Sequence, residues 1–487
     1  MSDGDGTAAQ AGGVLARWRN RDHTRGRLIV SLAVLSLPLL ISGLLYGAVF
    51  QIVDLSFISR LGEAPMAAVI IVNQSLRTTV MMLVMGASFG AQALIARAVG
   101  EGRIEAAEQV AGQTIVLGGM LALALAAVGG LFPELLFSLP GPDPGFAAYG
   151  VPYVRWAFLL LFGFVGAMLV SGILTGAGDT TAPLFLTLVN IGVALFAEWC
   201  LIFGHLGAPA LGVRGVALGL AIGQTTALSV GLSVLFRGRA RVHLRRRHLR
   251  PDAAVLRAIL AIAWPPALHM VGSLFLTFAF LRMSGHFGES VQAAYAIGLR
   301  LGMIAPAVCF PLATACATLV GQSLGAGDVA RAKRAVAVGL LVHGSAMLLF
   351  AGTTFFLRRE IMALLSDDPE VIRQGSEYLR YASGAFTMWA FYFVFFRSLQ
   401  GAGDVIVPMV LSLGNTFCVT VPLAYVLAFV AGFGPTGLWM AFLTGSVVLT
   451  VTTGLYMATG RWTRRGAPVS LGAPTVGGGT DARPTAM

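Results

Sequence analysis

Two acidic residues, Asp54 and Glu198, stand inside long apolar stretches of the sequence. An ionised carboxylate costs several kcal/mol in hydrocarbon, so an acid at such a position is a functional candidate by default. Asp54 precedes Gly62 by eight residues and Glu198 precedes Gly204 by six, and both glycines end their stretches on the same side. At about 1.5 Å per residue, both carboxyls lie roughly 9–12 Å from that end. Two carboxyls close together do not both ionise cheaply, so the pair predicts one coupled proton site.

Four further residues in the same two stretches are predicted to support the function of Asp54 and Glu198. Gln51 and Asn190 are candidate hydrogen-bond partners, and Tyr46 is a candidate wall of a substrate cavity. Pro38 lacks a backbone amide, which allows the helix that carries Asp54 to bend when the acid takes up a proton. Protonation is therefore expected to change the shape of the first helix.

Two arginines also lie deep in apolar stretches, Arg77 in the second and Arg300 in the eighth. They are predicted either to line a central cavity or to form ion pairs with the acids. In the simpler alternative, each acid is only paired structurally with an arginine such as Arg77.

Other chemistry finds no support in the sequence. The four cysteines lie in apolar stretches without metal-ligand spacing to histidine. The Gly-Ala-Gly-Asp segments lack the Gly-Lys-Ser/Thr ending of a nucleotide-binding loop. The net charge of +11 arises from arginines that flank apolar segments, with no basic face interleaved with aromatics. We therefore expect no enzyme activity, cofactor, metal, nucleotide or nucleic acid, and transport would depend on an ion gradient.

The composition indicates an all-α polytopic membrane protein. Of the 487 residues, 56% are hydrophobic and 11% charged, whereas a soluble protein has about a quarter charged. A membrane-spanning helix needs about 20 apolar residues. Hydropathy predicts twelve such helices, near 28–58, 65–95, 109–132, 148–175, 182–204, 211–236, 255–284, 291–322, 333–356, 376–399, 407–430 and 436–459.

The distribution of basic residues predicts the topology. Arginines concentrate on the side of the N-terminus, so both termini are expected in the cytoplasm and the protein in the inner (plasma) membrane. The predicted organisation is a disordered tail (1–24), an N-terminal six-helix lobe (25–236), a basic cytoplasmic linker (237–252), a C-terminal six-helix lobe (253–461) and a second disordered tail (462–487).

The two halves repeat each other at an offset of 225 residues. Gly176-Ala177-Gly178-Asp179 recurs as Gly401-Ala402-Gly403-Asp404, and Asn190 recurs as Asn415. Because each repeat has six helices, both have the same orientation, which is a transporter design. The positions of the second repeat that correspond to Asp54 and Glu198 are Phe280 and Leu423. The acid pair therefore belongs to the first repeat alone.

These residues resemble the MATE (multidrug and toxic compound extrusion) family over almost the whole chain. The marks are Asp54 through Arg60-Leu61-Gly62, the run from Leu319 to Gly327, and the paired Gly-Ala-Gly-Asp segments. The resemblance implies a V-shaped, two-lobe transporter that exports amphipathic, often cationic, compounds in exchange for H⁺ or Na⁺. It is closest to the DNA-damage-inducible-type branch, which implies protonation in the N-terminal lobe. Ala194 stands where the family often has Asn, which leaves the coupling ion open.

The expected function is therefore multidrug or metabolite efflux by proton antiport, by a monomer embedded in the bilayer. Sodium-coupled export is one alternative. A lipid-linked oligosaccharide flippase is another, since Arg77 and Arg300 would suit an anionic substrate. A membrane-embedded enzyme or receptor lacks a nucleophile constellation and a sizeable soluble domain.

Overall fold

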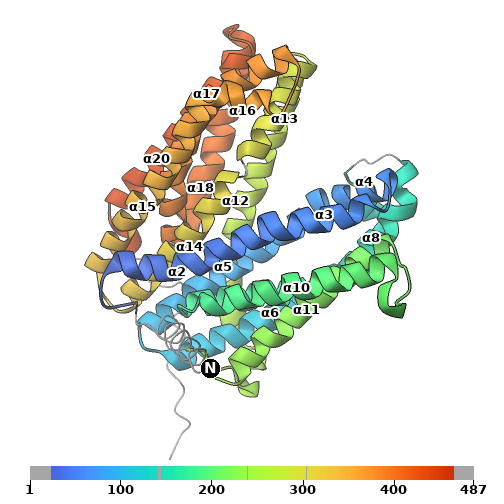
Figure 1. The fold of residues 1–487 in the computed structure, drawn as a ribbon. Coiled ribbons are helices and arrows are strands. Elements are labelled where there is room, and N and C mark those ends of the chain that lie inside the picture. Colours follow the sequence, from blue (N-terminus) through green and yellow to red (C-terminus); the bar gives the residue numbers. More distant parts are fainter. Residues whose placement is uncertain (1–22, 141–143, 239, 303, 465–487) are drawn as a thin grey trace, which may run out of the picture.

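Long apolar helices form the molecule, because a chain in lipid must satisfy its backbone hydrogen bonds within each segment. The computed structural model describes residues 23–140, 144–238, 240–302 and 304–464, and these contain helices and turns but no strand (Figure 1). Nine of the described helices are each long and apolar enough to cross a bilayer, and the pair α8–α9, bent by 48°, forms a tenth span. Two further long segments, α13–α14 and α17, complete the twelve predicted spans.

Ten helices belong to the first half of the chain. They are α2 (Leu28–Leu44), α3 (Gln51–Ser59), α4 (Glu63–Val72), α5 (Thr78–Gly100), α6 (Ile104–Leu131), α7 (Pro133–Ser138), α8 (Ala147–Leu159), α9 (Leu161–Gly176), α10 (Thr181–Phe203) and α11 (Val213–Phe236). Two hydrophobic clusters form the core of this N-lobe.

Nine helices belong to the second half. They are α12 (Ala253–Gly285), α13 (Glu289–Gly302), α14 (Ile304–Gly325), α15 (Val329–Phe356), α16 (Arg358–Ala363), α17 (Pro369–Gly401), α18 (Ile406–Gly414), α19 (Val421–Tyr425) and α20 (Pro435–Ala458). This C-lobe has a separate hydrophobic core around Phe280, Tyr378 and Trp439. The prediction of two six-helix lobes is confirmed.

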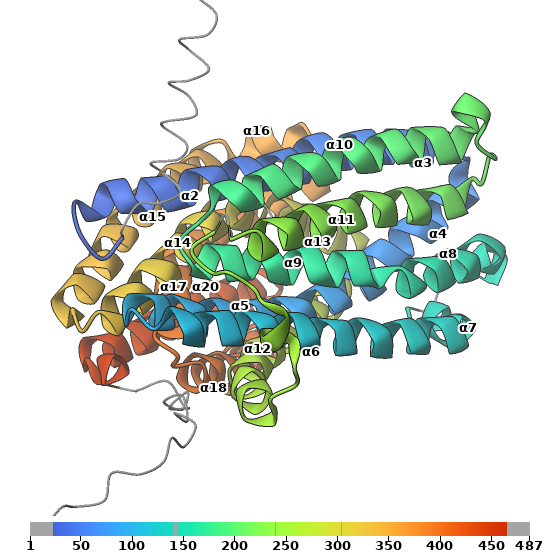
Figure 2. The ribbon, with the colours of Figure 1, turned by 90° about the horizontal axis from the view of Figure 1, so that it is seen from below.

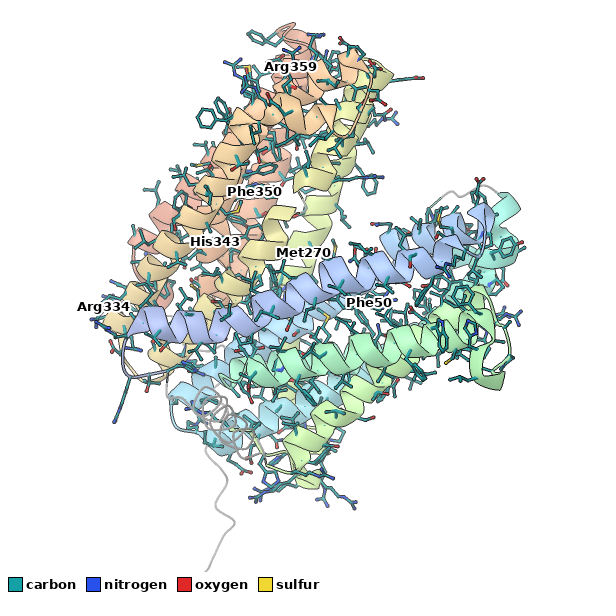
Figure 3. All side chains as sticks on the ribbon, in the orientation of Figure 1. Phe50, Met270, Arg334, His343, Phe350 and Arg359 are labelled. Atoms are coloured by element: carbon teal, nitrogen blue, oxygen red, sulfur yellow. The ribbon has the colours of Figure 1, made fainter. Side chains whose placement is uncertain are left out.

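The two lobes meet at one end and diverge toward the other (Figure 1). In the view from below, the two lobes overlap (Figure 2). We name the end with the linker 237–252 and the start of α2 the linker end. The opposite end, with the turns before α4 and α16, is the splayed end. Figure 3 shows Arg334 at the linker end of the C-lobe and Arg359 at its splayed end.

Glycines bring the lobes together at the linker end in a pseudo-symmetric contact. A Cβ at Gly100 would lie 2.2 Å from the carbonyl oxygen of Gln322, and one at Gly325 would lie 2.2 Å from that of Arg97. Residues 97 and 322, like 100 and 325, are related by the 225-residue offset. Each lobe therefore presents the same backbone surface to the other, as expected for two parallel repeats.

A buried arginine adds polar links across this contact. Arg397 of α17, 1% exposed, donates to the Oε1 atom of Gln92 on α5 at 2.6 Å. Its guanidinium lies 3.8 Å from the ring centre of Phe89, also on α5. The Gln92 amide in turn donates to Thr318 Oγ1 of α14 at 2.9 Å. These contacts hold the lobes together at the linker end.

Four π-helical turns interrupt three of the spans. They are Leu45–Phe50, between α2 and α3, Asn73–Arg77, between α4 and α5, Asn415–Thr420, after α18, and Val426–Val430, after α19. A π-helical turn accommodates an extra residue and is frequent at functional sites. The first span, Leu28–Ser59, runs through Pro38, and its π-helical turn begins seven residues after that proline.

The linker is folded onto the N-lobe rather than extended. Gln113 of α6 donates to the carbonyls of His248 and Arg250, at 2.9 and 2.7 Å, and accepts from the amide of Asp252 at 2.9 Å. A Cβ at Gly112 would lie 2.3 Å from the His248 carbonyl oxygen. Only glycine therefore permits the linker to lie so close to α6.

The predicted tails lie mostly outside the described residues, which begin at 23 and end at 464. Within the described part, Arg331 of α15 donates to the carbonyls of His23, Arg25 and Gly26. Trp462 is buried and donates to the Met457 carbonyl. Residues at both tail boundaries thus pack against the C-lobe.

Candidate functional site

The two predicted acids come together inside the N-lobe. Asp54 lies on α3, directly after the π-helical turn Leu45–Phe50, and Glu198 lies on α10 with no exposed surface. The two carboxyl groups are close enough to influence each other electrostatically. On the far side of Glu198, a Cβ at Gly219 would lie 2.4 Å from the Glu198 Cγ atom, so α11 packs tightly against this acid. Similar depth in two neighbouring helices, expected from the sequence, produces this pair.

Arg77 is the cation beside the acids. It ends the π-helical turn Asn73–Arg77 and interacts electrostatically with both Asp54 and Glu198. Its guanidinium also lies 5.4 Å from the ring centre of Phe164. No N–H or hydroxyl group of the described residues hydrogen-bonds to either oxygen of Glu198. One positive charge therefore faces two carboxyls, and the cluster carries a net charge of −1 when both are ionised.

Tyr153 and Asn73 extend the site, and the sequence analysis did not assign them to it. The fully buried Tyr153 hydroxyl donates to Asn73 Oδ1 at 2.9 Å and interacts with Arg77. Both residues, with Arg77 and Gln224, line a small cavity of about 20 Å³. Tyr153 corresponds to Tyr378 at the 225-residue offset, but its link to Asn73 depends on a π-helical turn that no pattern in the sequence predicts.

The other predicted residues lie at varying distances from the acids. Tyr46 stacks on Phe50 in the first π-helical turn, with ring centres 5.0 Å apart, and interacts with Arg77 (Figure 3 labels Phe50). Gln51 is exposed at the start of α3. Asn190 lies two helical turns from Glu198, about 12 Å along α10.

Pro38 and Arg300 lie outside the cluster. Pro38 is buried in α2, sixteen residues before Asp54, or about 24 Å along the helix. Arg300 is exposed on α13 of the C-lobe. The structure therefore brings Asp54, Glu198, Arg77 and Tyr46 together, and it does not bring Arg300 to the acids.

A separate acidic cluster lies on the linker. Glu105, Glu108 and His248 are the one group of three His, Cys, Asp or Glu side chains among the described residues that is close enough to share a metal ion. Arg247 donates to Glu105 at 2.8 Å, and the amide of Arg245 donates to His248 Nδ1 at 3.3 Å. His248 Nε2 lies 3.2 Å from a carboxylate oxygen of Glu105 and 3.1 Å from Arg247 Nε. The cluster is already paired internally, and it fastens the linker to α6.

Comparison with known proteins agrees with this architecture. The MatE family model matches residues 38–200 and 265–426, one match in each lobe. The relative named "Probable multidrug resistance protein NorM" of Thermotoga maritima is 23% identical over 426 residues, covering 85% of this chain and 89% of the relative. The "FAD transporter" of Shewanella oneidensis is 25% identical over 414 residues, covering 84% and 89%.

A crystal structure of MATE in the bent conformation has the same fold. It superimposes with a TM-score of 0.82 at 20% sequence identity, covering 91% of this chain and 98% of that structure. Together with a family model that matches most of the chain in two equivalent halves, this shows that the protein belongs to the MatE family of multi-pass membrane transporters and is not an enzyme.

Proposed function

We propose that the protein exports amphipathic, mainly cationic, compounds in exchange for protons. The observation that carries this proposal is the buried Glu198 beside the half-buried Asp54, with the single cation Arg77 close to both. The net charge of −1 is neutralised by one proton or by one monovalent cationic substrate. Because burial penalises an uncompensated charge, the two compete for the site, and this competition is the basis of antiport.

The conformation of the lobes suggests the direction of transport. With the linker end in the cytoplasm, as its arginines favour, the helices diverge toward the outside. A proton arriving from the outside would then displace the substrate from the acids. Protonation would remove a charge near the π-helical turn Leu45–Phe50 and permit the first span to change shape there. The inner membrane, the cytoplasmic termini and the monomeric state belong to the same proposal.

Two alternatives differ in what occupies the acids. Sodium also prefers carboxylate oxygens, so the same pair would serve a sodium-coupled exporter. The relative named as an FAD transporter favours a planar metabolite as cargo instead of a drug. A lipid-linked oligosaccharide flippase is less well supported, because Arg300 lies in the other lobe, away from Arg77.

Ethidium efflux from proteoliposomes tests this proposal. We expect efflux to require a pH gradient, acidic on the side that receives ethidium, and to proceed without sodium. The variant Asp54→Asn should lose gradient-driven efflux while eluting as a folded protein. Arg300→Gln, a charge removed from the other lobe, is the matched control and should retain efflux. A requirement for sodium at every pH, or full proton-driven efflux by Asp54→Asn, would contradict proton coupling at this site.

A further inference from the structure

A groove of about 330 Å³ on the outer side of the N-lobe takes no part in the acid site. It lies between α10 and α11 at the linker end, and α11 runs along the edge of the N-lobe that faces away from the C-lobe (Figure 1). Besides two valines, its described lining consists of one ring, three hydroxyl side chains and one arginine, namely Phe185, Thr226, Ser229, Ser233 and Arg237. Most of these side chains are exposed and α11 is a membrane span, so the groove opens toward lipid.

The hydroxyls of this groove lie where the last helix of the C-lobe is aliphatic. The helices α11 and α20 align at an offset of 222 residues, since the connection before α20 is shorter. This offset pairs four glycines with glycines, Gly212 with Gly434, Gly215 with Gly437, Gly223 with Gly445 and Gly238 with Gly460. Ser229 and Ser233 then correspond to Val451 and Leu455, which are 50% and 65% exposed. A helix side that faces lipid is expected to be apolar, as α20 is, so the hydroxyls of α11 are a local departure.

The two serine hydroxyls are available to a ligand. Ser229 and Ser233 each donate to the carbonyl oxygen four residues earlier, both at 2.8 Å. Each of these carbonyls also accepts the ordinary N–H bond of the helix. A hydroxyl that turns away therefore leaves no unpaired group behind, and it becomes a donor to an acceptor in the groove.

Arg237 supplies a positive charge at one end of the groove. It follows the last residue of α11 and lies one helical turn, about 6 Å, beyond Ser233. Among the described residues, no carboxylate forms an ion pair with Arg237, and the described lining contains no Asp or Glu. An exposed arginine at the end of a span lies at the level of the lipid headgroups and binds phosphate well. Charge complementarity therefore favours an anionic occupant.

We propose that this groove binds one anionic diacyl phospholipid from the leaflet at the linker end. The phosphate accepts from the Arg237 guanidinium, and the ester carbonyl oxygens, which lie deeper, accept from Ser233 and Ser229. One acyl chain packs on Phe185. The volume is within the range of ligand sites, about 300–1,000 Å³, and it suits the glycerol phosphate with the adjoining part of the chains.

A second copy of the chain is a less suitable occupant of the same groove. A two-fold axis along the membrane normal would place the same surface of both copies in contact and bring their Arg237 side chains together. The two positive charges would repel each other. The lipid proposal depends neither on the coupling ion nor on the substrate of transport.

Native mass spectrometry of the purified, delipidated full-length protein in detergent tests the proposal. The first phosphatidylglycerol molecule should bind at least about fivefold more tightly than phosphatidylcholine with the same chains. Glycerol 3-phosphate has the charge but no chains and should not displace the lipid. Equal affinity for the two lipids would contradict the proposal. Displacement by glycerol 3-phosphate would instead indicate a site for free phosphate and would also overturn it.

Matched variants locate the lipid. Arg237→Gln should weaken phosphatidylglycerol binding about fivefold. Arg334→Gln, which removes an exposed arginine from the linker end of the C-lobe, should leave binding unaltered. The double variant Ser229→Val/Ser233→Leu gives α11 the side chains of α20 and should weaken binding at least about threefold. Because all of these side chains are exposed, each variant should elute from size exclusion like the wild type.

Three results with these variants would overturn the proposal. The first is equal weakening by Arg237→Gln and Arg334→Gln, because general attraction to the basic end would then explain the binding. The second is full affinity in the double variant. The third is a dimer that forms without lipid and is lost in the double variant, which would assign the groove to a second copy of the chain.

Discussion

The N-lobe and the C-lobe share a frame but differ in what they place inside it. In the N-lobe, Asp54 and Glu198 meet beside a π-helical turn. At the corresponding positions the C-lobe has Phe280, which is fully buried against other rings, and Leu423. Its own interior cavity is built from His269, hydroxyls and aromatic rings. The two repeats are therefore similar scaffolds, and the acid pair lies in the first of them.

At the contact between the lobes, the buried charged residue belongs to the C-lobe instead of the N-lobe. Arg397 crosses from the C-lobe to Gln92 and Phe89, whereas its counterpart at the 225-residue offset is Gly172. A Cβ at Gly172 would lie 2.2 Å from Ser88 Oγ. The N-lobe thus holds the acid pair, and the C-lobe supplies the arginine that reaches across the contact between the lobes. Four experiments test this division, from the largest expected effect to the smallest.

The largest effect is expected at Arg77. Arg77→Met leaves two buried carboxyls without their cation, which should cost about 3–5 kcal/mol of stability and abolish efflux. Thermal melting of the purified protein measures the stability loss. Adding Asp54→Asn to Arg77→Met should restore part of the melting temperature, because one uncompensated acid is gone. Arg300→Met, which removes an exposed arginine from the C-lobe, is the control. A melting curve of Arg77→Met identical to wild type would mean that the acids do not depend on Arg77.

A smaller effect is expected when the second acid is neutralised. Glu198→Gln leaves a single carboxyl beside Arg77, so the acids no longer titrate as a pair and the pH dependence of proton-driven efflux should change. We expect efflux about tenfold slower at a fixed gradient, with a shifted pH dependence. Leu423→Gln places the same side chain at the equivalent site of the C-lobe and should leave the pH profile unchanged. If both variants shift the pH profile equally, the hypothesis that the acids of the N-lobe determine this profile is wrong.

Arg397→Leu should have a smaller effect, which is to weaken the contact between the lobes at the linker end. Loss of its hydrogen bond to Gln92 and its contact with Phe89 should weaken the closed contact and change the ratio of conformers about five- to tenfold. Spin labels at Ser59→Cys and Arg359→Cys, in a background without the native cysteines, report the distance across the splayed end. Shorter distances should become more populated. Gly172→Ser, at the equivalent N-lobe position, tests whether any perturbation there has the same effect. An unchanged distance distribution for Arg397→Leu would show that the glycine contact alone closes this end.

The smallest effect on transport is expected in the linker. Arg245, Arg246 and Arg250 are exposed, and each basic residue near anionic headgroups contributes about 1 kcal/mol to membrane association. Replacing all three by Gln should lower the amount of inserted protein but not the efflux per inserted molecule. Quantitative immunoblotting combined with dye efflux separates the two quantities. Complete loss of efflux by inserted protein would place the linker in the mechanism.

The sequence predicts the fold well because its signals are local or repeated. Hydropathy identifies each span, and the 225-residue offset pairs Gly100 with Gly325 before any contact is known. The acid pair is also accessible, since Asp54 and Glu198 have similar depth in helices of the same direction. Features that depend on irregular backbone, such as π-helical turns, cannot be predicted from the sequence. The π-helical turns bring Arg77 to the acids and Asn73 to Tyr153, and no residue type marks them.

Long-range polar contacts are the second kind of feature that the sequence does not reveal. Arg397 has the appearance of an ordinary basic residue near a helix end, and its partner Gln92 is 305 positions away. The same holds for Gln113 and the linker, which are 135 to 139 positions apart. Arg300 shows the opposite case, because it lies deep in an apolar stretch as Arg77 does, yet its exposed side chain belongs to the C-lobe, away from the acids.

The attachment of the linker limits how the lobes can move as mechanical bodies. The Asp252 amide is held by Gln113 of the N-lobe, and the Asp252 carboxylate caps the first turn of α12, at the amides of Ala254 and Val255. Asp252, which is bonded to the N-lobe, is thus also the residue that begins α12, and no flexible loop lies between the two. A vertical, elevator-like translation would need a loose tether at this connection. Tilting does not, but Val255, Ile259 and Ile262 in the first turns of α12 are packed in the N-lobe core, so the rest of the C-lobe would tilt beyond them.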